Sequence, residues 1–235
     1  MSELYVESAY YRLLFRERHA DVQHYRELAR RHGGPVLELG VGDGRVAFAL
    51  ADDGHQVTGV DRSPHMLASL EASRDGRSVE AHEADMREVR LDATFRLVLC
   101  PFNGFAHMHT HEDRAAFFDT VRAHLAPDGL FAFDLTIPDP SHLAGGTSFV
   151  PRVVHPRTGA VCRMEETYAF DGDQQVLTIT TRLVERLSGE VQTLELALRQ
   201  WQPAQTAQML ARAGFTVESR GAAIGDSLSY VCRLS

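Results

Sequence analysis

The sequence predicts one α/β domain with a mostly parallel sheet and an antiparallel β insert after its fifth strand. Between residues 36 and 135, short apolar runs alternate with stretches of helical periodicity, which is the pattern of βαβ units with helices on both faces of a sheet. A glycine-rich turn at 40–44 joins the first apolar run to the helix that follows it. After the proline-rich segment 138–140, closely spaced turn residues indicate hairpins instead.

The expected elements follow from apolar periodicity and from residues that start or end helices. We expect a helix over 5–31, which Gly33-Gly34-Pro35 ends. The alternating region then predicts strand 36–39, helix 45–53, strand 56–60, a helix opening at Ser63-Pro64, strands 79–82 and 95–100, a helix from the capping box Thr110–Asp113 to about Leu125, and strand 130–135. The remainder predicts three or four strands within 150–202, with turns at 156–159, 171–173 and 188–190, followed by helix 203–213 and strands 215–217 and 228–234.

These elements divide the chain into four segments, with no sequence repeat or low-complexity linker between them. They are an N-terminal helical cap, 1–34, a Rossmann-like core, 35–140, an antiparallel β insert, 141–202, and a closing helix with strands that complete the core, 203–235. We interpret the insert as part of one domain, in which it serves as a substrate lid or a dimer contact.

The composition excludes several classes of chemistry. The 235 residues carry a net charge of −8, and all 24 basic residues are arginine. Without lysine there is no Schiff-base catalysis, no pyridoxal-phosphate anchor and no Walker A phosphate site. An acidic chain with scattered arginines is a poor nucleic-acid binder, because phosphate neutralisation supplies most non-specific affinity. We therefore expect no nucleic-acid partner.

The cysteines and the N-terminus indicate where the protein works. Cys100, Cys162 and Cys232 form no C-x-x-C motif, which predicts buried free thiols in a reducing cytosol and no structural zinc. The first residues are acidic where a secretion signal has basic ones, and no apolar run approaches the ~20 residues of a membrane span. We expect a cytoplasmic protein without a membrane segment.

The glycine loop at 40–44 reads G-V-G-D-G and lies between a strand and a helix. Glu38 precedes its first glycine by two positions, and Arg45 stands where a dinucleotide fold has the third glycine of G-x-G-x-x-G. Dinucleotide folds place a pyrophosphate at the start of this helix, whereas a nucleoside without phosphates needs close approach of the backbone, which small residues permit. The loop therefore favours a nucleoside-type ligand.

Acidic residues end the next two strands. Asp61 follows the second strand, and a carboxylate there can accept hydrogen bonds from both ribose hydroxyls. Asp85 ends the third strand and can accept from an adenine amino group, while Met86 can pack on the ring. Because open α/β sheets bind ligands at the carboxyl ends of their strands, these groups predict one nucleoside pocket.

Taken together and in order, residues 35–135 resemble the class I S-adenosylmethionine-dependent methyltransferases. The resemblance is carried by V-L-E-L-G-V-G-D-G-R, V-T-G-V-D-R-S-P-H-M-L, A-D-M-R, P-F-N-G-F-A-H-M and L-A-P-D-G-L-F-A-F-D-L. It implies a seven-stranded Rossmann-like sheet with an antiparallel last strand. It also implies a core that binds S-adenosylmethionine and releases S-adenosylhomocysteine. The β insert resembles that of amino-sugar and peptide N-methyltransferases from natural-product pathways.

The resemblance also implies which residues hold the cofactor. The glycines lie along its methionine part, Asp61 holds the ribose, and Asp85 and Met86 meet the adenine. Val41 departs mildly from the family, which usually has a small residue or cysteine there. The full cofactor set is Glu38, Gly40, Val41, Gly42, Gly44, Asp61, Arg62, Asp85, Met86 and Pro101.

The loop after the fourth strand is where we expect methyl transfer, because this loop passes near the transferable methyl group in related enzymes. Phe102 can wall the site and Asn103 can orient a nucleophile, although the same loop can be a tight turn covered by aromatic side chains. His107 is the candidate general base for an oxygen nucleophile. His109 and His111 continue an alternating pattern, but a capped helix follows at once, so we expect no metal site.

Substrate contacts are expected from the N-terminal cap and the insert. Hydroxyl groups of Tyr10 and Tyr11 can reach the cofactor or the substrate, because helices before the first strand often close over the cofactor in this family. Arg199 and Trp201 share one face of a strand, where they can bind an acidic or aromatic substrate or form a dimer contact.

The sequence thus predicts an S-adenosylmethionine-dependent methyltransferase that transfers a methyl group by direct in-line displacement to a nitrogen or oxygen of a small molecule in secondary metabolism. Nitrogen is favoured, because an amine only has to arrive neutral and the sequence offers no convincing base. A peptide N-terminus as acceptor, and a non-catalytic S-adenosylmethionine-binding protein, are the alternatives. A nucleotide-dependent oxidoreductase fits Arg45 and the Asp85-Met86 pair less well. We expect a monomer or homodimer.

Overall fold

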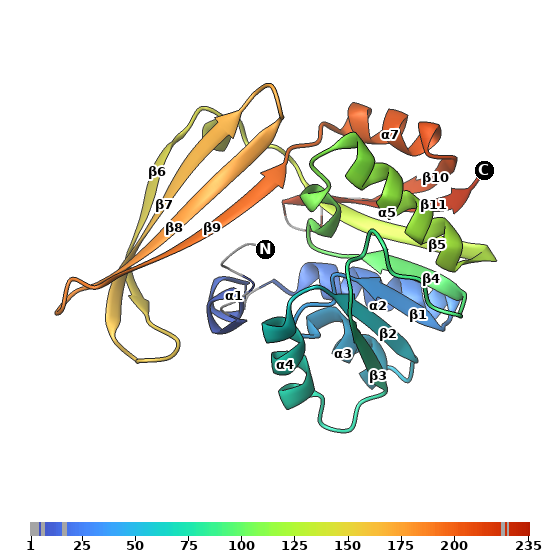
Figure 1. Ribbon diagram of the computed structural model, residues 1–235, viewed down its shortest axis with the longest axis horizontal. Coiled ribbons are helices and arrows are strands. Elements are labelled where there is room, and N and C mark those ends of the chain that lie inside the picture. Colours follow the sequence, from blue (N-terminus) through green and yellow to red (C-terminus); the bar gives the residue numbers. More distant parts are fainter. Residues whose placement is uncertain (1–4, 6–7, 16–17, 222–223, 225) are drawn as a thin grey trace.

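The structure is a computed structural model that describes the chain apart from residues 1–4, 6–7, 16–17, 222–223 and 225. Figure 1 shows its two sheets, a long curved one built by the insert and a twisted one in the core. All three cysteines are free and buried. Within the described part of the chain, no helix is long and apolar enough to cross a membrane.

The core sheet has seven strands in the order β10-β11-β5-β4-β1-β2-β3. Neighbours from β3 to β5 pair in parallel, whereas β11 is antiparallel to both β5 and β10. The strands are β1 (Val36–Leu39), β2 (Val57–Asp61), β3 (Val79–Glu83), β4 (Phe95–Cys100), β5 (Leu125–Thr136), β10 (Phe215–Arg220) and β11 (Ser227–Leu234). The seven-stranded, mostly parallel sheet expected from the sequence is confirmed, and parallel pairing brings the carboxyl ends of β1, β2, β3 and β4 to one edge.

The flanking helices begin and end close to where the sequence placed them. They are α2 (Ala20–His32), α3 (Arg45–Asp52), α4 (Pro64–Ser73), α5 (His111–His124) and α7 (Pro203–Arg212). The Ser63 side chain caps α4 through the backbone N–H of Met66, and Thr110 and Asp113 form the expected capping box of α5. Strand β5 begins at Leu125 and not at residue 130 as expected, because the segment before Leu130 stays beside β4 through an irregular pairing.

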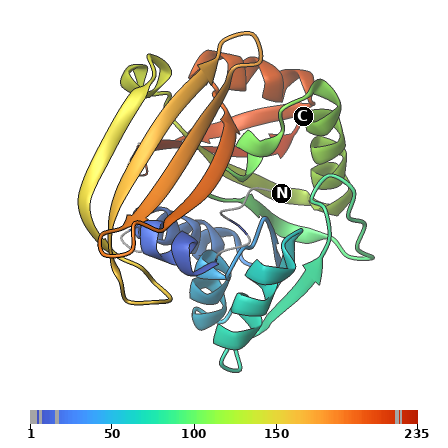
Figure 2. The ribbon, with the colours of Figure 1, turned by 60° about the vertical axis from the view of Figure 1, so that its left-hand side comes forward.

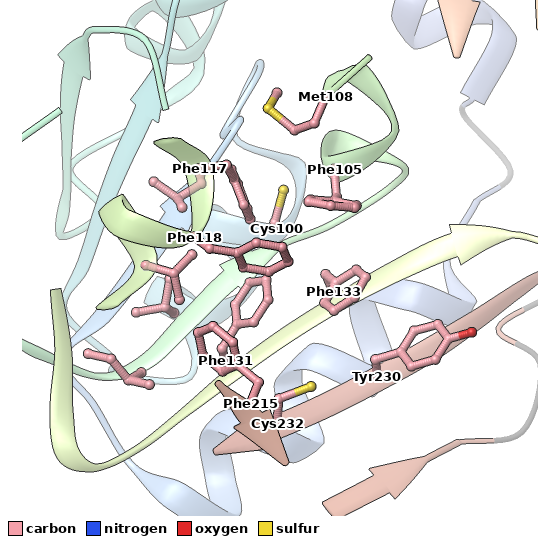
Figure 3. Packing of buried hydrophobic residues seen from close by; sticks show 14 of the residues in the cluster. Cys100, Phe105, Met108, Phe117, Phe118, Phe131, Phe133, Phe215, Tyr230 and Cys232 are labelled. Carbon is pink, nitrogen blue, oxygen red and sulfur yellow. The ribbon is translucent and has the colours of Figure 1, made fainter. Parts of the chain in front are cut away.

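Apolar side chains fill both faces of this sheet. Along β4, Val98 and Cys100 belong to one buried cluster, while Leu97 and Leu99 belong to the cluster on the opposite face. The first cluster is rich in aromatic rings (Figure 3) and extends from β5 and α5 to Phe105 in the short 3₁₀ helix η2 (Gly104–His107). The loop that follows β4 is therefore anchored by the core of the protein.

The insert is an antiparallel sheet in the order β6-β7-β8-β9, as the hairpin turns predicted. Its elements are α6 (Pro140–Leu143), β6 (Gly146–Val154), β7 (Val161–Asp171), β8 (Val176–Glu185) and β9 (Val191–Arg199). Figure 2 shows the long strands arching over α1 (Ser8–Phe15). Strand β9 lies at the edge of the sheet that faces the core, next to η2.

The single helix expected over 5–31 is wrong, because the structure has two helices, α1 and α2. The two helices pack on different sheets. Tyr10 of α1 is buried against the insert with Cys162 and Met164, whereas Tyr25 of α2 is buried in the cluster on the core sheet. One straight helix cannot reach both sheets, so the segment forms two separate helices, α1 and α2.

Buried charges fix the start of α2. The carboxylate of Asp21 is completely buried and forms two hydrogen bonds, of 2.7 and 2.6 Å, with the guanidinium group of Arg45 at the start of α3. Arg18 approaches the same carboxylate at 3.3 Å. The ion pair joins the N-terminal cap to the helix that follows the glycine loop.

We expect Asp21→Asn to lower the free energy of unfolding by about 3 kcal/mol, because it leaves the Arg45 guanidinium without its charge partner in a buried site. Urea denaturation followed by circular dichroism measures the change. Glu27→Gln is the matched control on α2, since Glu27 pairs with Arg31 at the surface and its loss should cost less than about 1 kcal/mol. Equal losses in the two variants would contradict the role of the ion pair.

Candidate active site

A cavity of about 830 Å³ lies at the carboxyl edge of the core sheet. Of the predicted cofactor residues, all except Gly44 line it: Glu38, Gly40, Val41, Gly42, Asp61, Arg62, Asp85, Met86 and Pro101. We call it the cofactor cavity. The structure thus brings together groups that come from the ends of four strands.

The glycine loop needs its glycines for backbone shape. Gly40 and Gly42 have φ values of +79° and +58°, which favour glycine, and a Cβ at Gly42 would lie 3.2 Å from the Met66 side chain. Gly44 caps α3 beside the ring of Phe48 and shapes the loop from outside the cavity. Gly44 does not line the cavity, so the cavity lining does not support the predicted contact between Gly44 and the cofactor.

Val41 is accommodated by a second glycine. Its side chain packs on Gly59 in β2, where an added Cβ would lie only 2.7 Å from a Val41 methyl group. Val41 is larger than the residue that the family usually has at this position. The protein accommodates it because the residue opposite, Gly59, has no side chain.

Asp61 ends β2 and faces the glycine loop. One of its carboxylate oxygens accepts the Gly42 backbone N–H at 2.8 Å, and the other accepts that of Ser63 at 2.8 Å. Burial raises the pKa of this carboxyl group above its ordinary value. Each oxygen keeps acceptor capacity beyond its backbone bond, so the group can still accept a hydrogen bond from a ligand hydroxyl.

Glu38 carries a polar atom that protein groups do not satisfy. The residue is 2% exposed and lines the cofactor cavity, and its Oε2 has no hydrogen-bond partner among the described residues. Burial raises its pKa well above the ordinary value. Buried polar atoms are nearly always paired, so this oxygen fits a cationic ligand group such as the ammonium of an amino acid.

Asp85 is held in place by a neighbour that the sequence reasoning missed. Arg87 binds it through a 2.6 Å ion pair and also pairs with Asp113 at the start of α5. The hydrogen bond from Arg87 holds the pKa of Asp85 below its ordinary value, so the carboxylate stays ionised. An ionised acceptor in a fixed orientation suits an amino group on a flat ring.

The loop after β4 has an unusual backbone. Phe102 and Asn103 both have positive φ, at +49° and +60°. The Phe102 ring lines the cavity and lies under the Arg18 guanidinium, 4.3 Å from its centroid. The Asn103 side chain instead binds Thr136 at the end of β5, at 2.7 and 2.8 Å, so it fixes the loop and does not line the cofactor cavity.

His107 shares a hydrogen bond with Tyr5, which the sequence reasoning did not select. The Tyr5 hydroxyl lies 2.8 Å from His107 Nε2, and the Tyr5 carbonyl accepts from the Ser63 hydroxyl at 2.7 Å. Burial is the main cause that lowers the pKa of His107 to about 4. Near neutral pH the cavity is therefore lined by a neutral imidazole and a neutral phenol.

Comparison with known proteins agrees with this geometry. The family model described as a methyltransferase domain matches residues 36–129. This segment is therefore similar to a methyltransferase domain, and the core sheet has the fold of class I methyltransferases.

Three similar proteins illustrate the range of relatives. The cypemycin N-terminal methyltransferase of Streptomyces sp is 40% identical over 114 residues, which is 48% of this chain and 46% of that protein. The CcbJ methyltransferase of Streptomyces caelestis superimposes with a TM-score of 0.77 at 25% identity, over 93% of this chain and 90% of that one. The glycopeptide N-methyltransferase MtfA, in complex with S-adenosylhomocysteine, gives 0.65 at 23% identity, over 91% and 87%. The chain spans about half the length of the curated relatives it matches.

The remaining predicted site residues lie in different places. Tyr11 lines the cofactor cavity, whereas Tyr10 is buried against the insert and its hydroxyl binds His155 and Gln192. Tyr10 therefore fixes α1 to the insert and does not line the cofactor cavity.

Arg199 and Trp201 join the insert to the loop beside the cofactor cavity. Arg199 donates to the carbonyl oxygens of His109 and Gln174 at 3.2 and 2.6 Å, and its guanidinium lies 5.0 Å from the Trp201 ring centroid. Trp201 packs on Phe105 in the aromatic cluster. Both line a second cavity, not the cofactor cavity. The expectation that they share one face of a strand is wrong, because β9 ends at Arg199 and Trp201 follows it.

The insert supplies one wall of the cofactor cavity through Thr193, Glu195 and Ala197 of β9. The sequence carried a signal for this wall, because T-L-E-L-A-L at 193–198 alternates small or polar residues with leucines, as an edge strand between two environments does. Within the described part of the chain, no three histidine, cysteine, aspartate or glutamate side chains are grouped as a metal site.

We expect Asp61→Asn to weaken S-adenosylhomocysteine binding about tenfold, because it removes the charge from the acceptor predicted for the ribose. Isothermal titration calorimetry measures the affinity. Asp52→Asn is the control, since Asp52 pairs with Arg77 on the surface. Unchanged affinity in a folded Asp61→Asn protein would remove the ribose assignment.

The lowered pKa of His107 predicts a pH effect on stability. Between the ordinary value of about 6.5 and the folded value of about 4, the unfolded chain binds more protons than the folded one, so the free energy of unfolding falls as pH falls through this range. From pH 7 to 5, the stability advantage of wild type over His107→Gln should shrink by on the order of 1–2 kcal/mol. Urea denaturation at both pH values measures it. The carboxyl groups titrate in both proteins and cancel, so a constant difference would refute the burial of a neutral imidazole.

Proposed function

We propose that this methyltransferase transfers a methyl group from S-adenosylmethionine to a nitrogen of a small molecule in secondary metabolism. The observation that carries the proposal is the cofactor cavity itself. It combines carboxylates from the core with the neutral Tyr5–His107 pair, and the insert strand β9 forms one of its walls.

The residues present fit the cofactor. Glu38 and the glycine loop would hold its methionine part, Asp61 its ribose, and Asp85 and Met86 its adenine. When bound, S-adenosylmethionine supplies an electrophilic methyl group on a cationic sulfur, and S-adenosylhomocysteine is the product.

The chain's own groups suit a cationic ligand. His107 is neutral near pH 7, so it adds no positive charge beside a sulfonium, and its ring orders the Tyr5 hydroxyl. Tyr11 and Phe102 wall the same cavity with aromatic surface. Such groups orient an acceptor and exclude water, and orientation alone can supply roughly 7–11 kcal/mol of barrier reduction.

The lowered pKa of His107 favours nitrogen over oxygen as the methyl acceptor. A general base works best with a pKa near the operating pH, and a value of about 4 makes this imidazole a weak base for a hydroxyl group. An amine loses its proton to water before it reacts and needs no protein base. Two similar proteins are named as methyltransferases of nitrogen, one acting at an N-terminus and one on a glycopeptide, which keeps a peptide amine as the second candidate acceptor.

We expect the purified protein to bind S-adenosylmethionine and S-adenosylhomocysteine but not NAD in calorimetric titrations, because Arg45 occupies the third-glycine position and Asp85 lies in the adenine region. Release of S-adenosylhomocysteine in the presence of panels of amines and alcohols then tests the acceptor, with turnover expected for amines. NAD binding alone would overturn the proposal. Cofactor binding without turnover on either panel would favour a non-catalytic binding protein.

A further inference from the structure

A second cavity, of about 980 Å³, lies between the insert sheet and the core. It shares two lining residues with the cofactor cavity, Phe102 and Glu195, so a molecule that fills it lies next to the cofactor cavity. The proposed function explains the cofactor cavity and leaves this second one unassigned.

The insert gives the second cavity an apolar wall. Three leucines of β9, Leu194, Leu196 and Leu198, line it. On β8, Leu177 and Ile179 stand opposite Leu198 and Leu196 in register and line the same cavity. Cross-strand pairs on one face form a continuous surface, and a mostly apolar pocket of this size suits the body of a drug-sized molecule.

The acidic side chains on the lining already have partners within the protein. Asp226 forms an ion pair of 3.0 Å with Arg18. Asp139 and Glu166 accept hydrogen bonds at 2.8 and 3.0 Å, and Glu195 takes part in an interaction as well. The hydrogen-bonding capacity that a ligand could use must therefore come from other groups.

Two donors on the same lining have no partner. Among the described residues, Trp201 Nε1 and Arg199 Nε are buried atoms without a hydrogen bond, and the Trp201 side chain is only 7% exposed. Indole and guanidinium N–H groups can donate but cannot accept. Because buried polar atoms are nearly always paired, these two N–H groups indicate an acceptor atom that the protein itself does not supply.

Arg199 is held by neutral groups. Its terminal nitrogens donate to the carbonyl oxygens of His109 and Gln174 and to the Gln175 side chain. Burial lowers the pKa of Arg199, since the guanidinium group loses solvation without an acidic partner among the described residues. A ligand oxygen with negative charge would offset that loss.

Positive charge gathers around the Trp201 ring. The guanidinium carbon of Arg199 lies 5.0 Å from the ring centroid, and that of Arg114 lies 5.4 Å from it. Burial and then the charge of Arg199 lower the pKa of Arg114. Both charges therefore favour an electron-rich oxygen beside the indole N–H over a cation.

We infer that the second cavity binds an apolar group that carries a carbonyl or carboxylate oxygen, and that Trp201 Nε1 and Arg199 Nε donate hydrogen bonds to this oxygen. The inference rests on the proposed function in one respect, because this group would be the part of the methyl acceptor remote from the reacting nitrogen. Arg199 and Trp201 line the second cavity and not the cofactor cavity. The acceptor class is thereby narrowed to amines with an apolar body and an oxygen acceptor.

The single tryptophan makes the test direct, because a ¹⁵N-labelled protein has one indole N–H cross-peak. The probes are 4-phenylbutanoate, 4-phenylbutanamide and 4-phenylbutylamine, titrated with S-adenosylhomocysteine present. They share one apolar body, and the protonated amine lacks the acceptor oxygen of the other two. We expect the acid and the amide to move the indole proton resonance downfield and to bind about tenfold more tightly than the amine. Their relative affinities distinguish a charged oxygen from a neutral one.

Trp201→Phe should lower the preference for the acid and the amide over the amine about fivefold in calorimetric titrations, because it removes one donor and keeps an apolar ring. Arg199→Met, which removes the other donor, should lower it as well. The preference is the readout, because lost packing affects all three probes alike. Arg182→Met on β8 is the matched control, since Arg182 pairs with Glu165 and lines neither cavity. Circular dichroism melting verifies that the variants fold.

Three results would overturn the inference: an indole cross-peak that neither the acid nor the amide moves, an amine that binds as tightly as both, or a preference that neither variant lowers. The first two are measured on wild-type protein and do not depend on the folding of a variant. Failure of the proposed function is distinct, because it would show as a wild-type protein that does not bind S-adenosylhomocysteine in calorimetry.

Discussion

The ion pair between Asp21 and Arg45 holds together the parts that make the cofactor cavity. Arg45 is the first residue of α3, directly after the glycine loop, and Asp21 lies in the first turn of α2. Because the Asp21 carboxylate is fully buried, its charge requires the guanidinium partner, and α2 must lie where Arg45 can reach it. The same interaction brings Arg18 over the Phe102 ring, so the loop after β4 is ordered from the N-terminal side. A dinucleotide fold has a glycine at this position, which permits close packing of helix and strand. This chain has Arg45 there instead, and Arg45 holds the N-terminal cap through Asp21.

The buried carboxyl groups of the cofactor cavity favour a cationic ligand. Parallel strands bring several carboxyl groups to one edge, and burial raises the pKa of Glu38, Asp43 and Asp61. Each raised pKa means that the ionised form is destabilised by lost solvation, and a cationic ligand would offset that cost. His107, with its lowered pKa, contributes no competing charge. Asp85 differs because Arg87 satisfies it, in keeping with a partner that is a neutral ring. The cavity therefore distinguishes a charged end of its ligand from an uncharged end.

The sequence predicts the core of this site well because local signals determine it. The strand ends at Gly40 and Asp61 can be predicted from periodicity and turn chemistry. Parallel pairing of the strands is then enough to bring these ends together. The break between α1 and α2 was not predictable in this way, because it depends on Tyr10 packing on an insert more than a hundred residues later in the chain. The same holds for Tyr5, which reaches His107 only through that tertiary arrangement. Arg199 shows a further limit, since β9 ends at this residue and its partners include backbone carbonyls that no side-chain pattern reveals.

The position of β9 at a sheet edge explains how one strand can serve two cavities. In the middle of a sheet, both faces of a strand are separated by its hydrogen-bonded neighbours, and a ligand cannot pass from one face to the other. At an edge the faces communicate past the strand, and the alternation of Thr193, Glu195 and Ala197 with leucines gives the two sides different chemistry. Edge strands usually need protection against pairing with another chain, and here η2 and the His109 contact with the Ala197 carbonyl cover part of the edge. Phe102 and Glu195 line both cavities beside this edge. The insert therefore acts as more than a cover, because its edge strand gives each of the two cavities a wall of different chemistry.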